Sequence, residues 1–434
     1  MRPQLSEEEA DRFRRNNVLR YVRTAGAERD DPWSPTPLDA AGLTPDYVVG
    51  PGGGCASVQE AVNRALREQR KGRVIIGVTA GLHRGLVYVP PASLAVTLLG
   101  LGASPSDVVL AENIDAEMQG SEFTRRFAAH FAEAPESITK LYRRIAGLSP
   151  ISTANASVVR VENDGFQLLN LTVQNTYNCD RSRGGDLAVN ALGQCRNGQH
   201  QAVALLVAGA DRVQVQNVAL RSFQDTLYLQ SPRKGETVRS CFTDCEIAGD
   251  VDFIFGQSTA WFEGCTIRSL GGRAATTWAT APSTDIRTSY GFVFEDCDFI
   301  HDGCAKGRHF LGRQWFEGVR ATPFGTPDIA GYHVVMGHQS AYDPPRGTIS
   351  TATLNSVGKC VIMRSRIGDH INGAVPWDDW GGNRWNPRYR PALYCARAMI
   401  EYLQDWLDAQ GQGYADLDTD APFLAEYVNS GNAS

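Results

Sequence analysis

One pattern recurs in the middle of the chain, in Cys241-Phe-Thr-Asp-Cys-Glu-Ile247, in Trp261-Phe-Glu-Gly-Cys-Thr-Ile267 and in Phe292-Val-Phe-Glu-Asp-Cys-Asp-Phe299. Each stretch is a short run of β-forming residues, then a small or polar residue, then a second short run. Further copies occur at 166–173, 213–220 and 361–367. The chain therefore repeats one strand–turn–strand unit over much of its length.

The break between the two runs falls at Asn170, Asn217, Asp244, Gly264, Asp296 and Arg364. Neighbouring breaks are 20 to 68 residues apart, with loops in the longer gaps. Irregular repeats of this unit are typical of a parallel β-helix, because each coil buries little alone and stacking completes the core. We predict an all-β, single-stranded parallel β-helix. Cys245, Cys265 and Cys297 then stack inward as small apolar side chains, which we prefer to a metal-binding column.

Helices are predicted at the ends of this stack and in one insertion. Residues 57–70 have one apolar face, and Ser57 with Glu60 can form a capping box, so this helix suits the open end of the β-helix. Residues 105–150 form a helical insertion whose phenylalanines are expected to pack against one another: Phe123, Phe127 and Phe131.

The same pattern divides the chain into three parts. Residues 1–45 are an N-terminal arm, and 46–390 are the β-helix domain with its insertion. Residues 391–434 are a helix, predicted over 392–408, and a polar tail packed on or beside the β-helix. We expect 411–434 to be loosely held.

Composition excludes several classes of protein. The chain has 434 residues, 42% hydrophobic and 21% charged, which is typical of a folded protein with a large core. Its net charge of -6 argues against a nucleic-acid-binding protein. No apolar run reaches the length of a membrane span, and the first residues lack the apolar segment of a secretory signal. Cys179 and Cys195 bracket a loop, and a disulfide between them would suit an oxidising compartment.

Acidic and amide side chains recur at the spacing of one coil. They occur in QAVAL (201–205), FQDTLYL (223–229) and GDVDFIFG (249–256). Adjacent parallel strands are about 4.8 Å apart, so Asp225 and Asp252 on successive coils would interact. Two close carboxyl groups differ in pKa, so one can act as a nucleophile or base and the other as a general acid. Gln201 and Gln224 would bring amide donors suited to a developing oxyanion.

A basic and aromatic motif follows, LGRQW at 311–315. Arg313 can pair with a carboxylate and hold it ionised, and Trp315 offers a flat face to a sugar ring. Each motif alone favours a simpler interpretation, in which Asp225 and Asp252 are turn residues and Arg313 is a solvated charge. The joint spacing of the acids, amides and arginine favours a catalytic site.

At these residues the sequence resembles the pectin methylesterases, the pectinesterase family. QAVAL, QDTLY, VDFIFG and LGRxW occur in the family's order, and the resemblance covers roughly 45–390. It implies a right-handed parallel β-helix with a cleft on one sheet face. It also implies an aspartyl esterase that converts methylated galacturonate in pectin or oligogalacturonides into free carboxylate and methanol, with no metal and no cofactor.

The resemblance assigns roles residue by residue. Asp252 is the nucleophile, Asp225 the general acid and base, Gln201 and Gln224 the anion hole, and Arg313 orients Asp252. Trp315, Tyr228 and Phe255 match aromatic residues of the sugar cleft, and Trp377 in the PWDDW segment matches a further one.

Two departures from the family pattern place the chain in a divergent bacterial branch. Gln314 stands where proline is common, which leaves Trp315 without a stiffened loop. Gly81-Leu-His-Arg-Gly85 replaces a motif with Tyr and Glu. The branch includes lipoproteins, so we expect a secreted, periplasmic or outer-membrane anchored protein, with any lipid anchor upstream of this sequence. We also expect a monomer and a preference for shorter oligogalacturonides.

Other functions remain open from the residues alone. A polysaccharide-binding β-helix would keep the aromatic cleft but has no need of paired acids with amides. A glycoside hydrolase uses paired carboxylates without an amide oxyanion hole. An esterase for another acyl group is compatible with the motifs. A calcium-dependent lyase lacks its acidic cluster, and His333 and His338 do not form a metal motif.

Overall fold

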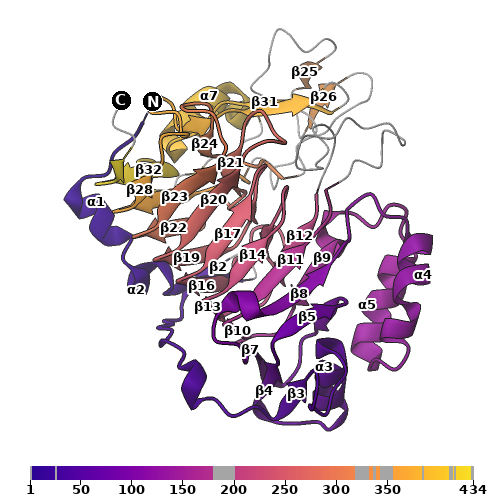
Figure 1. The fold of residues 1–434 in the computed structure, drawn as a ribbon. Coiled ribbons are helices and arrows are strands. Elements are labelled where there is room, and N and C mark those ends of the chain that lie inside the picture. Colours follow the sequence, from indigo (N-terminus) through magenta and orange to yellow (C-terminus); the bar gives the residue numbers. More distant parts are fainter. Residues whose placement is uncertain are drawn as a thin grey trace.

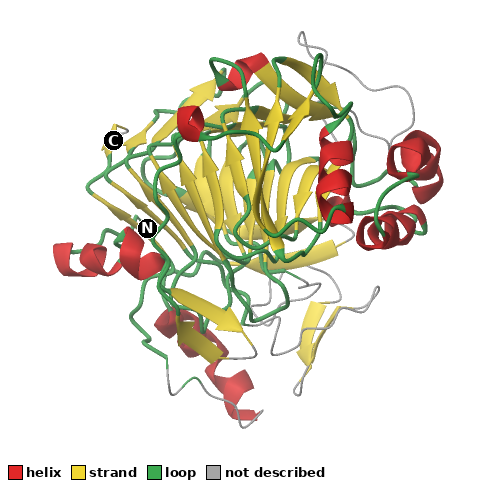
Figure 2. Ribbon diagram, turned by 90° about the horizontal axis from the view of Figure 1, so that it is seen from below, coloured by secondary structure: helices red, strands yellow, loops and turns green. Residues whose placement is uncertain are grey.

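The computed structural model describes residues 2–24, 27–178, 201–317, 332–335, 339–342, 355–383, 386–409, 414 and 417–431. Most strands belong to three long parallel sheets that wrap around one apolar core, and this is a parallel β-helix as predicted (Figure 1). Helices lie at the periphery of the stacked strands (Figure 2). Cys179, Cys195 and His338 lie outside the described residues, as do the side-chain contacts of His333.

The first sheet has ten strands: β3 (Tyr47–Val49), β4 (Gly72–Val78), β7 (Leu94–Gly100), β10 (Gln167–Leu169), β13 (Val213–Gln216), β16 (Arg239–Thr243), β19 (Thr259–Glu263), β22 (Phe292–Glu295), β27 (Cys360–Met363) and β32 (Leu424–Tyr427). The second has nine: β5 (Gly81–Arg84), β8 (Val108–Glu112), β11 (Thr172–Asn175), β14 (Ala219–Arg221), β17 (Glu246–Gly249), β20 (Thr266–Leu270), β23 (Asp298–Asp302), β28 (Arg366–Ile367) and β33 (Ser430–Gly431). The third has eight: β6 (Val87–Val89), β9 (Ser157–Val161), β12 (Val203–Ala208), β15 (Leu227–Gln230), β18 (Ile254–Gly256), β21 (Trp278–Pro282), β24 (Phe310–Arg313) and β29 (Trp377–Asp378).

The predicted break residues form the turn between the first and second sheets. All six have a positive φ, between 47° and 63°, and most are Asn, Asp or Gly, which tolerate this left-handed conformation. Side chains connect successive turns, since Asn217 Nδ2 donates to Asn170 Oδ1 at 2.9 Å and Asn170 Nδ2 to the Gly102 carbonyl at 2.8 Å. One residue of left-handed backbone therefore bends each of these six coils at the same place.

The residues after these turns point into the core, as predicted for the three cysteines. Cys245, Cys265 and Cys297 are 1 to 2% exposed and free, and each sulfur lies within hydrogen-bond distance of a backbone carbonyl. Burial raises the pKa of the Cys245 and Cys297 thiols, so these two are inert packing groups.

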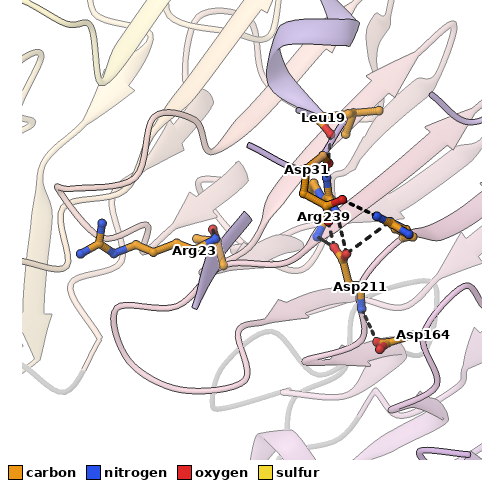
Figure 3. A network of polar contacts seen from close by, with 8 residues as sticks. Leu19, Arg23, Asp31, Asp164, Asp211 and Arg239 are labelled. Atoms are coloured by element: carbon orange, nitrogen blue, oxygen red, sulfur yellow. Dashed lines mark hydrogen bonds and ion pairs between the residues drawn. The ribbon is translucent and has the colours of Figure 1, made fainter. Parts of the chain in front are cut away.

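The N-terminal arm runs along the outside of the stack and is anchored by a buried arginine. It contains α1 (Glu7–Arg12), α2 (Arg15–Val18), β1 (Tyr21–Thr24), β2 (Ala27–Asp30) and the short helix η1 (Ala40–Gly42). Arg239, fully buried, donates to Asp211 Oδ2 at 2.6 Å, to Asp31 Oδ2 at 2.9 Å and to the Leu19 carbonyl (Figure 3). One guanidinium thus connects two segments of the arm with the coil, and further ion pairs such as Arg15 with Glu263 join the arm to the stack.

The capping helix is α3 (Val58–Arg67), shorter than the predicted 57–70. Ser57 Oγ accepts from the Glu60 N–H at 3.1 Å, as predicted. The predicted capping box is wrong in its second half, because the Glu60 carboxylate accepts from Ala56 N–H, one residue further out. The helix buries one face against the first coil, including Val58, Ala61 and Val62.

The helical insertion is narrower than 105–150. After the short helix η2 (Pro105–Asp107), β8 belongs to the second sheet, and only α4 (Gly120–Phe131) and α5 (Glu136–Ala146) are inserted helices, followed by the short helix η3 (Thr153–Asn155). β8 was not predicted because its apolar run of Val, Val, Leu and Ala is short and shows no alternation. The three phenylalanines are 0 to 4% exposed and pack, Phe123 and Phe127 with ring centroids 5.2 Å apart.

The C-terminal tail is not loosely held, so this expectation was wrong. α7 (Ala396–Ala409) begins later than predicted, and β32 then joins the edge of the first sheet by pairing with β27. Phe423, Leu424 and Ala425 are at most 1% exposed, so apolar burial holds a segment whose flanks are polar. Two antiparallel pairs complete the fold: β25 (Tyr332–Val335) with β26 (Gln339–Tyr342), and β30 (Trp380–Asn383) with β31 (Asn386–Arg390). Across the described ranges, no helix is long and apolar enough to cross a membrane.

Candidate active site

Asp225 and Asp252 occupy the same position on successive coils. Each lies two residues before a strand of the third sheet, and Leu227 of β15 pairs with Ile254 of β18 in register. Both acids have left-handed backbone, with φ of 67° and 50°. The Asp225 N–H donates to the Val251 carbonyl at 3.1 Å, which ties the two turns together. Backbone strain of this kind clusters at functional sites.

A cleft of about 670 Å³ opens on the third sheet at these turns. Eight of the nine predicted site residues line it: Gln201, Gln224, Asp225, Tyr228, Asp252, Phe255, Arg313 and Trp315. The stacking of coils thus brings together two acids, two amides, a guanidinium and three aromatic rings from four motifs far apart in the sequence.

Arg313 makes a two-point contact with Asp252. Its Nε donates to Oδ1 at 2.8 Å and its Nη2 to Oδ2 at 2.7 Å, with both side chains largely buried. The guanidinium lies between two indole rings, 3.9 Å from the centroid of Trp278 and 4.6 Å from that of Trp380. Such pairing and stacking fix the plane of the carboxylate.

Asp225 has the opposite electrostatic environment. It is 5% exposed, and burial raises its pKa well above the usual range, with a further contribution from the negative charge of Asp252. Arg313 opposes this rise but does not overcome it. The site therefore holds one carboxylate in an ion pair beside a second carboxyl group that binds a proton more readily than usual.

The two glutamines lie on adjacent coils at the edge of the same cleft. Gln201 and Gln224 form a parallel backbone bridge, in which the Ala202 N–H donates to the Gln224 carbonyl at 3.1 Å. Thr153 Oγ1 donates to Gln201 Oε1 at 3.0 Å, which assigns the oxygen of this amide to the threonine and turns its NH2 group toward the cleft.

Aromatic side chains form one wall of the cleft. The rings of Tyr228 and Phe255 stack with centroids 4.2 Å apart, and Trp315 meets them edge-on at 6.2 and 5.6 Å. An apolar, flat surface beside the acids suits the C–H face of a sugar.

Trp377 is not in the cleft, so its predicted role in substrate binding was wrong. It is 1% exposed on β29 and belongs to the main core. The cleft tryptophan of the PWDDW segment is Trp380, which lines the cavity over Arg313. Sequence reasoning also missed Trp278, whose Nε1 donates to Asp378 at 2.8 Å.

Gln314 holds its loop in place by side-chain hydrogen bonds, where a proline would restrict the backbone. Its amide is 1% exposed, its Nε2 donates to the carbonyls of Gly358 and Leu393, and its Oε1 accepts from the Leu393 N–H at 2.8 Å. The Trp315 N–H donates to the Pro282 carbonyl at 2.8 Å. The position of Trp315 is therefore fixed by hydrogen bonds.

A buried ion pair beneath the acids was not foreseen. Asp250, fully buried, pairs with Arg273, whose Nε lies 2.5 Å from its Oδ2, and the Val251 N–H donates to Asp250 Oδ1 at 2.6 Å. Because the Val251 carbonyl holds Asp225, this ion pair supports the turn that carries both acids. In the part of the chain that the structure describes, no group of three His, Cys, Asp or Glu side chains is arranged to hold a metal ion.

A parallel β-helix whose cleft holds paired carboxyl groups, amide donors, an arginine and a wall of aromatic rings fits a hydrolase that acts on a sugar polymer. Comparisons with known proteins agree with this class. Residues 137–322 match the family model described as Pectinesterase. The chain is 32% identical to pectinesterase B of Dickeya dadantii (strain 3937) over 400 residues, covering 87% of this chain and 88% of the relative. It is 34% identical to pectinesterase B of Pectobacterium parmentieri, covering 77% and 84%.

A solved structure supports the same assignment. Rice weevil pectin methyl esterase is similar over 100% of this chain and 98% of its own, with a TM-score of 0.72 and 25% sequence identity. The chain therefore belongs to the pectinesterase family. It is a carboxylic ester hydrolase, and its reaction is the demethylesterification of pectin.

Proposed function

We propose that Asp252 is the nucleophile that attacks the C6 ester carbonyl of a methylated galacturonate unit. The bidentate contact with Arg313 carries this proposal, because it leaves Asp252 ionised, oriented and open to the cleft. A carboxylate oxygen has two lone pairs, so each oxygen can accept from Arg313 and still attack. The attack forms an oxygen–carbon bond and moves the carbonyl electrons onto oxygen.

Gln201 and Gln224 stabilise the resulting oxyanion. The hydrogen bond from Thr153 prepares the Gln201 amide to donate toward the cleft before substrate arrives, and preorganised donors of this kind contribute most in a water-poor site. Replacing Gln201 with Ala is expected to lower kcat by about 100- to 1,000-fold, as loss of one oxyanion donor does elsewhere.

Asp225 transfers the protons. Its raised pKa keeps it protonated, so it protonates the departing methoxy oxygen as the C–O bond breaks, and methanol leaves. The Asp225 carboxylate then takes a proton from water, and the hydroxide attacks the acyl-enzyme. The acyl–oxygen bond to Asp252 breaks, which restores Asp252 as the free carboxylate, and Asp225 is again protonated. The product leaves as a carboxylic acid that carries the second proton of the water and gives it up to solvent.

Methanol release from methylated pectin by the Asp252→Ala variant tests this assignment. We expect turnover to be lost with the circular dichroism spectrum unchanged, and appreciable residual turnover would refute Asp252 as nucleophile. Trp315→Ala serves as the matched control, because it alters the sugar-contacting wall and should mainly raise KM. Measuring reducing ends alongside methanol separates an esterase from a glycoside hydrolase and from a polysaccharide-binding protein.

The length of the substrate, the assembly state and the cellular location are further parts of this proposal. We infer that methylated oligogalacturonides are accepted beside polymeric pectin, since inserted helices stand at one end of the third sheet, and that the protein acts as a monomer outside the cytoplasm or in the periplasm. Initial rates on short and long methylated chains test the first inference. Sedimentation and cell fractionation of the natural host test the others.

A further inference from the structure

A second hollow, of about 350 Å³, lies between α5 and the N-terminal coils of the third sheet. Figure 1 shows α4 and α5 as a pair beside these coils. Its apolar lining includes Val89, Pro90, Ile138 and Leu141. None of its lining residues belongs to the catalytic cleft.

The charged lining of this hollow is mainly basic: Lys140, Arg144 and Arg160 against a single carboxylate, Glu162. Glu162 is already paired, because Arg160 Nε lies 2.6 Å from its Oε1. Lys140 and Arg144 are exposed and make no ion pair with any residue in the described ranges. The hollow therefore has two cations whose charge is available to an anion.

A buried hydroxyl group without a partner faces the same charges. Tyr88 lines the hollow and is 1% exposed, and its hydroxyl has no hydrogen-bond partner among the described residues. Burial raises its pKa, and the charges of Arg160 and Arg144 oppose that rise. Arg160 lies beside Tyr88 on the neighbouring strand. A buried donor without an acceptor is costly, and an anionic oxygen in the hollow would satisfy it.

The hollow and the catalytic cleft lie along one row of the third sheet. Tyr88 pairs with Arg160, Arg160 with Leu206, and Leu206 with Tyr228. These side chains therefore share a face, and three strand spacings separate Tyr88 from Tyr228 by about 14 Å. Arg160 also donates to the carbonyl of Ala154, which lines the catalytic cleft.

We propose that this hollow is a carboxylate subsite that holds an already demethylated galacturonate unit of the chain whose methyl ester lies at Asp252. Lys140 and Arg144 attract the free carboxylate, the Tyr88 hydroxyl donates to it, and the apolar lining contacts the sugar ring. The inference rests on the proposed function, since it assumes that the cleft binds methylated galacturonate. Such a subsite would make partly demethylated chains better substrates than fully methylated chains.

Two sets of variants test the subsite. Lys140→Gln with Arg144→Gln removes both free cations from the exposed face of α5, and Arg143→Gln is the matched control, because Arg143 is an exposed cation of α5 outside the hollow. For partly demethylated oligogalacturonides we expect the double variant to raise KM about three- to ten-fold with kcat unchanged, since exposed charge contacts contribute modestly. KM for fully methylated chains should not change, nor should either constant in the control.

Tyr88→Phe removes only the hydroxyl and keeps the ring that stacks on Phe131 with centroids 5.0 Å apart. It should reduce the preference for partly demethylated chains in the same direction. Equal KM values for both substrates in the wild type, or an equal change for both substrates in the double variant, would overturn the subsite. Failure of the wild type to release methanol from either substrate would instead refute the catalytic assignment.

Discussion

Arg313 and Asp252 are joined by two hydrogen bonds of 2.8 and 2.7 Å between a guanidinium edge and both carboxylate oxygens. Asp225 lies in the same cleft without such a partner and has a raised pKa. The two acids differ in environment because β24, two coils beyond the turn of Asp252, supplies an arginine to Asp252 and not to Asp225. This difference in environment is the basis of the predictions on catalysis.

Arg313→Lys is expected to lower kcat about 100-fold while retaining the positive charge. A lysine is a single point charge and cannot hold both oxygens, so the plane of the Asp252 carboxylate is released, and small misplacements of a nucleophile cost rates of this order. Steady-state methanol release measures the effect. An unchanged kcat would show that charge alone is sufficient, and a matched loss of thermal stability would point to folding.

The pH dependence of Asp225 has a definite sign. Its folded-state pKa is raised, so the native state binds more protons than the unfolded state between the unfolded pKa and the folded one, and stability falls as pH rises through that window. Asp225→Asn should therefore lose methanol release but show a smaller loss of unfolding free energy from pH 4 to pH 8 than the wild type. Denaturant titrations at both pH values measure this difference, and parallel losses would contradict the buried, protonated acid.

The two tryptophans of the PWDDW segment are expected to behave differently. Trp377→Ala removes a fully buried ring and should cost about 3–5 kcal/mol of unfolding free energy. Trp380→Ala removes one of the rings over Arg313, so it should mainly impair methanol release and cost less stability. Denaturant unfolding and initial rates on both variants separate the effects, and an intact rate in Trp380→Ala would exclude a role for that ring.

The parallel β-helix and the proximity of Asp225 and Asp252 could be predicted from the sequence, because both depend on residues that recur once per coil. Left-handed turn residues such as Asn217 and Asp244 mark six of the coils, and the spacing of Asp225 and Asp252 is one coil. β32 was not predicted. The left-handed turn residue that follows it is Val428, and a β-branched residue disfavours this conformation, so the residue type does not indicate a turn.

Other features depend on contacts that no local pattern records. The sequence does not tell which tryptophan of PWDDW faces the core, since that depends on how β29 pairs with β24. The ion pair of Asp250 and Arg273 joins two loops whose proximity follows only from stacking. Gln314 illustrates the same point, because its three hydrogen bonds connect β24 with segments 44 and 79 residues away.

A cluster of imidazoles at the C-terminal coils predicts loss of stability in acid. His370 is fully buried with neither ring nitrogen bonded within the described chain, and its ring lies 4.7 Å from that of His301 and 5.9 Å from that of His309. The pKa of His370 is lowered to about 3, chiefly by burial and in addition by the charges of His301 and His309, against the opposing effect of Asp369. The native ring therefore stays neutral where the unfolded chain takes up a proton.

Because the pKa of His370 is lower in the folded protein than in the unfolded chain, its contribution to the free energy of unfolding is fully present above about pH 6.5. This contribution is lost as the pH falls below that value. At pH 5 the loss amounts to about 2 kcal/mol, by the conversion of 1.36 kcal/mol for each pH unit. His370→Leu keeps an apolar side chain of similar size and cannot be protonated. We expect its unfolding free energy to fall by about 2 kcal/mol less than that of the wild type between pH 7 and pH 5, measured by denaturant titration. His301→Gln, at the partly exposed ring, should retain most of the acid sensitivity, and equal slopes for the wild type and His370→Leu would show that the buried ring does not titrate on unfolding.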